Sequence, residues 1–156
     1  MHNNFTEARH NLEYFVLSKV TELTKRFGFE FIETDLAPNT FTDLMFAYKN
    51  STAGKVALPV FSGASNNTIY LTPKGNWGFR FWHDLVHCSN NFDFTLQGEI
   101  KTALVQLQDI TNTFGKNSLE YRVFRIDTIG QATYTNLYGK FVDNQIAFAK
   151  HYLGEI

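Results

Sequence analysis

The stretch GFRFWHDLVHCSNNFDFTLQGE, residues 78–99, carries two of the five histidines of the chain, four residues apart, at the end of one segment with helical periodicity. An α-helix advances about 100° per residue, so this segment separates into a polar arc and an opposite apolar arc. The polar arc consists of Arg80, His83, Asp84 and His87, and the apolar arc of Phe81, Trp82, Leu85 and Val86. The stretch therefore predicts an amphipathic helix with a histidine-bearing face.

The regions on either side of this stretch predict a mainly α-helical (α+β) fold with one small β-hairpin. We expect one domain over residues 1–156, because domains usually contain roughly 100–200 residues. Residues 55–75 hold two β-prone runs around a Ser/Gly/Asn-rich connection and predict the hairpin. The predicted helices cover residues 3–28, 40–50, 77–89, 95–114, 118–139 and 143–154. Thr95 and Asp143 are the predicted N-caps, and Gly28, Gly115 and Gly139 the predicted ends. Gly130 is expected to weaken the helix over 118–139.

Composition excludes several classes of protein. With Cys88 as the one cysteine, an intramolecular disulfide or a multi-cysteine zinc framework cannot form. The net charge of −1 and the lack of a basic run disfavour nucleic-acid binding. The N-terminal region does not have the pattern of a signal peptide, and no apolar run approaches the roughly 18–20 residues that span a bilayer. We expect a soluble, cytoplasmic protein without a membrane partner.

Aromatic residues make up 16 % of the chain, and 16 of them are phenylalanines. Aromatic side chains bury large areas and dominate both cores and interfaces. We expect a phenylalanine-rich core, and the alternative is an aromatic binding surface.

The histidine face has two interpretations. It is either a solvent-exposed helix face or a metal site, because histidines at i and i+4 lie one above the other at a spacing that one metal can bridge. Glu99 favours the metal site, since it lies at the edge of the apolar stripe of the next predicted helix, beside Gly98, and needs a partner there. Two imidazoles and one carboxylate suit Zn²⁺, with Fe²⁺ or Mn²⁺ as alternatives.

This site predicts hydrolysis by a metal-activated water. His83, His87 and Glu99 are the candidate metal ligands, and Asp93 competes with Glu99 for the third position. Asp84 or Glu99 is the candidate base, and Arg80 is expected to stabilise an anionic substrate or transition state.

Three further polar residues share one face of a later helix. Asp127, Gln131 and Tyr134 lie at i, i+4 and i+7, and are expected to orient a histidine ring from behind or to form a self-contained hydrogen-bonded patch. Cys88 lies at the margin of the apolar arc, which favours a small core residue over a nucleophile.

The segment HDLVHCSNNFD, residues 83–93, resembles the zincin-type metalloprotease motif. The resemblance implies His83, His87 and Asp93 as zinc ligands and Asp84 as the base. The chain departs from the motif at Asp84, where zincins have glutamate, and at Asn90, where one branch has glycine.

A second resemblance covers more of the chain. Residues 79–99 and 126–145 are similar to small proteins encoded by bacterial plasmids, phages and other mobile elements, with a Trp-His-Asp…His…Asp-Phe…Gly-Glu pattern. The resemblance implies a bacterial accessory protein and names no reaction. It raises the alternative of a non-catalytic inhibitor, such as an anti-CRISPR-like or nuclease inhibitor, that binds a host or defence-system protein.

Overall fold

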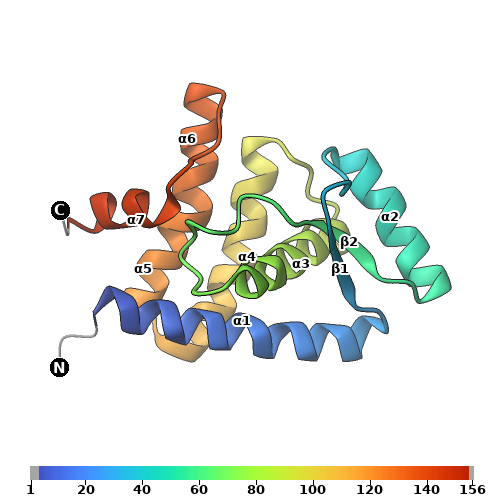
Figure 1. Cartoon of the computed structure of the whole chain (residues 1–156), viewed down its shortest axis with the longest axis horizontal. Coiled ribbons are helices and arrows are strands. Elements are labelled where there is room, and N and C mark those ends of the chain that lie inside the picture. The colour runs from blue at the N-terminus through green and yellow to red at the C-terminus, as the bar shows by residue number, and fades with distance from the viewer. Residues whose placement is uncertain (1–3, 155–156) are drawn as a thin grey trace.

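The computed structural model describes residues 4–154, and its fold is mainly α-helical with one small sheet, as predicted. Figure 1 shows the order of the elements along the chain. The elements are α1 (Phe5–Phe27), β1 (Phe31–Thr34), α2 (Phe41–Gly54), β2 (Leu58–Phe61), α3 (Pro73–Asn90), α4 (Leu96–Phe114), α5 (Leu119–Arg125), the π-helix η1 (Ile126–Gly130), α6 (Gln131–Tyr138) and α7 (Gln145–Leu153).

The helices surround α3, which lies in the middle of the molecule (Figure 1). α1 runs along one side and packs on α3 and α5, and α4 packs on α3 and α5 as well. α5, η1 and α6 follow one another in a column, with α7 beside it, whereas α2 and the sheet lie at the other end of the molecule. The histidine-bearing helix is therefore held from several sides.

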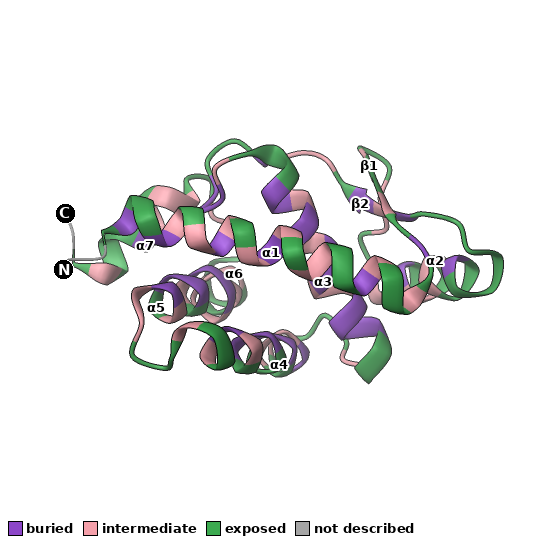
Figure 2. Cartoon of the chain, turned by 90° about the horizontal axis from the view of Figure 1, so that it is seen from below, coloured by how far each residue is buried: buried purple, intermediate pink, exposed green. Residues whose placement is uncertain are grey.

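Local sequence explains the limits of α1. The side chain of Asn4 accepts a hydrogen bond from the backbone N–H of Glu7, and Gly28 ends the helix with a positive φ of 82°. Asn3, where the predicted helix began, lies outside the described residues. Figure 2 shows buried and exposed bands alternating along α1, because the apolar side chains recur every three or four residues.

The predicted β-hairpin is wrong. Residues 58–61 do form a strand, but β2 pairs in parallel with β1, with Phe31 opposite Leu58, and α2 forms the crossover between them. The second β-prone run forms no strand. The guanidinium of Arg9 instead binds the carbonyl oxygens of Thr68, Ile69 and Tyr70, which fixes this run against α1.

α3 begins at Pro73, four residues before the predicted start. Thr72 is its N-cap and accepts a hydrogen bond from the N–H of Gly75, while Pro73 needs no hydrogen-bond partner at this position. Glu13 of α1 accepts hydrogen bonds from both the N–H and the hydroxyl of Thr72. A Cβ at Gly75 would lie 2.2 Å from the Glu13 Oε1, so a larger residue there would displace the Glu13 side chain.

The other predicted helix ends are largely confirmed. Thr95 caps α4, and Gly115 and Gly139 follow the last residues of α4 and α6. The prediction of Asp143 as the N-cap of the last helix is wrong by one residue. Asn144 takes this position, and its side chain accepts a hydrogen bond from the N–H of Ala147.

The core is rich in aromatic rings, as expected. The ring of Trp82 packs between Phe15 of α1 and Phe124 of α5, with both centroid distances 5.6 Å. Other aromatic side chains, such as Phe141, are exposed, so core and surface share the aromatic residues. Among residues 4–154, no helix is long and apolar enough to cross a membrane.

We expect Leu12→Ala to lower the free energy of unfolding by about 2–5 kcal/mol, because the Leu12 side chain is fully buried in α1 and its loss leaves a cavity. Tyr14→Ala on the same helix is the control, since Tyr14 is 77 % exposed and its loss is expected to change the stability by less than about 1 kcal/mol. Urea unfolding of both variants measures the difference. Equal losses would show that α1 does not pack on the core as described.

Candidate metal site

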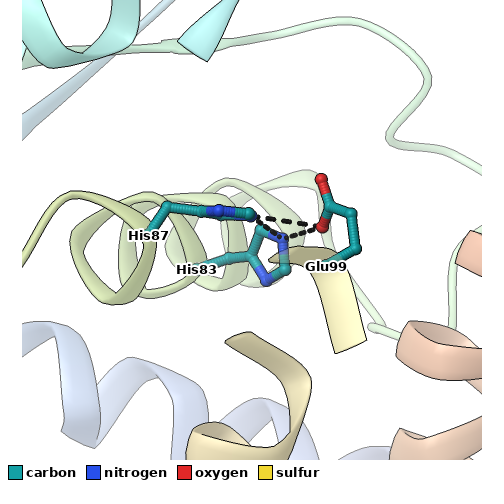
Figure 3. Close-up of side chains that lie close together, drawn as sticks. All are labelled: His83, His87 and Glu99. Carbon is teal, nitrogen blue, oxygen red and sulfur yellow. Dashed lines mark hydrogen bonds and ion pairs between the residues drawn. The ribbon is translucent and has the colours of Figure 1, made fainter. Parts of the chain in front are cut away.

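The structure brings His83, His87 and Glu99 together, as Figure 3 shows. The two histidines lie one turn apart on α3, and Glu99 lies in the first turn of α4. The Nε2 atoms of the histidines are 3.0 Å apart, and the Glu99 Oε2 lies 3.0 Å from the Nε2 of His83 and 3.2 Å from that of His87.

The histidine face is not uniformly solvent-exposed: His87 is buried, whereas Arg80, His83 and Asp84 are partly exposed. His87 is fully buried, and its ring packs against those of Phe94 and Phe41, at centroid distances of 5.0 and 6.4 Å. His83 and Glu99 are partly exposed. The cluster therefore has a closed side at His87 and an open side at the other two residues.

Acceptors behind the rings fix both imidazoles. The His87 Nδ1 lies 2.7 Å from the carbonyl oxygen of Phe92, and a carbonyl only accepts, so this Nδ1 carries the proton. The His83 Nδ1 lies 2.8 Å from the Oε1 of Gln106 and donates to it. In a neutral ring the lone pair is then on Nε2, the atom that faces Glu99.

The loop between α3 and α4 sets the position of Glu99. Asn91 ends α3 in the left-handed conformation, with φ 55°, and the next N–H, that of Phe92, bonds back to the carbonyl of His87. The chain then passes so close to α4 that a Cβ at Gly98 would lie 2.0 Å from the carbonyl oxygen of Asp93. Glycine, which has no Cβ, leaves room for this close backbone approach.

Charge interactions within the cluster shift two pKa values in opposite directions. Burial alone would raise the pKa of Glu99, but the hydrogen bonds from His83 and His87 outweigh it and lower the pKa to about 2. Burial alone would lower the pKa of His83, but the hydrogen bond and the charge of Glu99 raise it. Without a metal, the pairing therefore favours the ionised form of Glu99 and the protonated form of His83.

The three ligand atoms suit a single metal ion. Zinc binds imidazole nitrogen and carboxylate oxygen at about 2.0–2.2 Å, which places neighbouring tetrahedral ligands about 3.3–3.5 Å apart. The observed separations of 3.0–3.2 Å are a few tenths of an ångström shorter, so small side-chain rotations are enough. Two fixed lone pairs and one carboxylate facing one another need a cation between them, whether proton or metal.

Asp84 lies beside the cluster and Asp93 does not join it. Desolvation raises the pKa of the Asp84 carboxyl to about 6, with the nearby positive charge of His83 opposing the shift. Asp84 forms no hydrogen bond or ion pair within residues 4–154. The Asp93 carboxylate instead accepts hydrogen bonds from the N–H and hydroxyl of Thr95 before α4, so Glu99 is the carboxylate of the group that could hold a metal ion.

Arg80 has a structural role here. Its guanidinium donates to the carbonyl oxygens of Phe61 and Gly63 and lies over the ring of Phe61, which ties α3 to the end of β2. Its expected role toward an anionic substrate stays a prediction.

The predicted network behind the histidines is only partly assembled. The Gln131 amide donates to the carboxylate of Asp127 over 2.6 Å, which is the self-contained pair considered from the sequence. Within the described chain, neither residue hydrogen-bonds a histidine. Tyr134 packs against Tyr138 and Phe148 instead, away from the cluster.

The residues that do orient the rings were missed. They are Gln106 and Thr102 of α4; the Thr102 hydroxyl donates to the carbonyl of Gly98 and lies 3.2 Å from the His87 Nδ1. A sequence pattern could have identified them. One face of this helix carries three polar residues within a mainly apolar stripe, at i, i+3 and i+7: Glu99, Thr102 and Gln106.

Cys88 is a core residue, as favoured from the sequence. Its side chain is buried, and desolvation raises the pKa of the thiol to about 12. A thiol that stays protonated at neutral pH is a poor nucleophile.

No protein-family model matches the chain, and neither a curated protein nor a solved structure is significantly similar to it. The geometry and chemistry of the site therefore carry the functional argument.

Burial also predicts a pH-dependent stability. Desolvation raises the pKa of Asp127 in the folded protein to about 7, above its value in the unfolded chain. The folded state then binds more protons than the unfolded state between about pH 4 and pH 7, so the contribution of Asp127 to stability falls as pH rises through this window. Between about pH 4 and pH 7, we expect the free energy of unfolding of Asp127→Asn to increase relative to that of the natural chain by on the order of 2–4 kcal/mol.

Urea unfolding at a series of pH values measures this gain. Asp143→Asn is the control, because Asp143 is exposed and its variant is expected to differ from the natural chain by a constant amount. A constant difference for Asp127→Asn as well would contradict the raised pKa.

Proposed function

We propose that the protein binds one divalent metal ion, with Zn²⁺ best suited, through His83, His87 and Glu99, and uses it for hydrolysis. The observation that carries the proposal is the convergence of the two Nε2 atoms and the Glu99 Oε2 within about hydrogen-bond distance of one another. Fe²⁺ and Mn²⁺ bind the same kinds of ligand atom, and metal analysis distinguishes them.

The surroundings of the three residues support a metal site. Ligating histidines usually donate their other N–H to a carbonyl or carboxylate, which fixes the ring and raises its basicity. Here the Nδ1 of His83 and of His87 bond to the Oε1 of Gln106 and the carbonyl of Phe92. The buried His87 and the partly exposed Glu99 leave the fourth position on the open side.

That fourth position suits a water molecule. A zinc ion lowers the pKa of its bound water to about 7 and so supplies a hydroxide at neutral pH. Asp84 follows the first histidine directly and has a free carboxylate with a pKa of about 6, close to the value that suits a general base near neutral pH. The reaction class that fits is hydrolysis of a polar bond, with Asp84 as the proton acceptor.

The first test is the metal content of protein purified without a histidine tag. We expect about one ion per chain in the natural protein, because three ligand atoms are already in place. His83→Ala and His87→Ala each remove one ligand and should lose the ion, as measured by elemental analysis.

Two variants serve as controls. His10→Ala removes an exposed histidine of α1, and Asp93→Asn removes the carboxylate that binds Thr95; both should keep the ion. Protein that takes up no zinc, iron or manganese, or that binds it equally well without His87, would refute the metal site.

The second test addresses catalysis. Against a panel of ester, amide and phosphoester substrates, we expect hydrolysis that a chelator abolishes and zinc restores. Asp84→Asn should keep the metal and lower kcat by about 10²–10⁴-fold, since it removes the base and not a ligand. A metal-loaded Asp84→Asn variant with unchanged kcat would remove Asp84 from the mechanism.

The binding-protein alternative makes a different prediction. Large exposed apolar residues, Phe46 and Phe141 among them, are the anchors such an inhibitor would use, and its action would be indifferent to chelators. A partner from a host or defence system and a mobile-element origin stay predictions.

A further inference from the structure

A cavity lies on the column of α5, η1 and α6, away from the histidine cluster. It has a volume of about 650 Å³, and residues of α5, η1, α6 and α7 and of the loop before α5 line it. None of His83, His87 and Glu99 is among them. Figure 1 shows α7 beside the column, so this groove lies in the corner between them. Cavities of about 300–1,000 Å³ suit small organic ligands.

Aromatic rings form one wall of the groove. The ring of Tyr134 lies 4.7 Å from that of Tyr138 and 5.6 Å from that of Phe148, and Phe148 lies 4.8 Å from Tyr152, measured between centroids. Tyr138 and Tyr152 are more than half exposed although their rings are largely apolar. Such a connected set of accessible rings offers a flat aromatic body several faces and edges to pack against.

The charges around the groove have one sign. Lys116, Arg122 and Arg125 line it, and no aspartate or glutamate does. Within residues 4–154, none of these three cations forms a salt bridge. In a chain whose net charge is −1, three unpaired cations beside an aromatic wall are a local excess of positive charge. They complement an anion, since Arg and Lys form strong charge-assisted hydrogen bonds with carboxylate and phosphate.

The backbone at the groove is unusual as well. Ile126, Ile129 and Gly130 of the π-helix η1 are among the residues that line the groove. π-Helical turns are rare in proteins overall, and those that occur are often found at functional sites. Asp127 of the same turn is buried, so this turn separates the groove from the interior.

We propose that this groove binds a small molecule that has a flat aromatic body and an anionic group. The tyrosine and phenylalanine rings pack against the body, and Arg122 and Arg125 bind the anion. Aryl carboxylates and nucleoside phosphates share this chemistry. The site is separate from the proposed metal centre and needs no metal.

Isothermal titration tests the proposal with 1-naphthoate as the probe and 1-naphthamide as its neutral counterpart. We expect one binding site per chain and an affinity at least about 10-fold higher for the anion, because a charge-assisted hydrogen bond contributes that much. Binding should be equal with and without a chelator. Equal affinity of the natural chain for the two probes, or no binding of either, would overturn the proposal. This test needs no variant.

Variants locate the site. Thr133→Trp places a large side chain in the groove and should abolish binding, since Thr133 is exposed and lines it. Arg122→Gln/Arg125→Gln should weaken binding of naphthoate at least about 10-fold and leave that of naphthamide unchanged. Lys25→Gln/Lys49→Gln is the matched control, because it removes two exposed positive charges elsewhere. Circular dichroism verifies that each variant folds.

Two further results distinguish the alternatives. Competition between adenosine monophosphate and naphthoate, without competition from adenosine, would identify a nucleotide; competition from aryl carboxylates alone would identify an organic acid. Naphthoate binding that Thr133→Trp does not change would overturn the proposal. So would a concentration-dependent dimer in sedimentation that Thr133→Trp dissociates, because a second copy would then occupy the groove.

Discussion

The packing of Trp82 between α1 and α5 is the interaction on which the remaining structure depends. Its ring contacts Phe15 on one side and Phe124 on the other, so one side chain of α3 joins elements that are far apart in the sequence. This contact fixes the rotation of α3 about its axis. Because His83 and His87 lie on the same helix, that rotation also decides which way their rings point.

The opposite wall of the cluster depends on α4 and on the short connection before it. Gly98 lets the backbone of Asp93 pass close to α4, and this turn brings Glu99 to the histidines. The same helix supplies Gln106, whose side chain holds the ring of His83 from behind. Two adjacent helices and one tight loop thus provide both the candidate ligand atoms and the groups that orient them.

Local patterns predicted the helices well, because capping residues and apolar periodicity act within a few residues. The sheet could not be predicted in this way. Its two strands are separated by α2, and the competing run at residues 68–70 is held by Arg9, about 60 positions away. Helical geometry predicted that His83 and His87 lie together and made Glu99 a candidate partner. It could not predict how far the histidine face is exposed to solvent. That depends on Phe94 and Phe41, which pack on His87 from other elements.

The π-helix η1 joins α5 to α6 with one residue more in its turn than an α-helix would need. Such a turn behaves as a one-residue insertion that the fold has absorbed. Deleting one residue within 126–130 would restore an ordinary helix with α6 nearly unmoved, whereas winding all five residues as an α-helix would turn everything that follows by roughly 100° relative to α5. In that second case Tyr134 would leave Phe148. The register of this single turn couples the interior of the protein to the surface that α6 and α7 present.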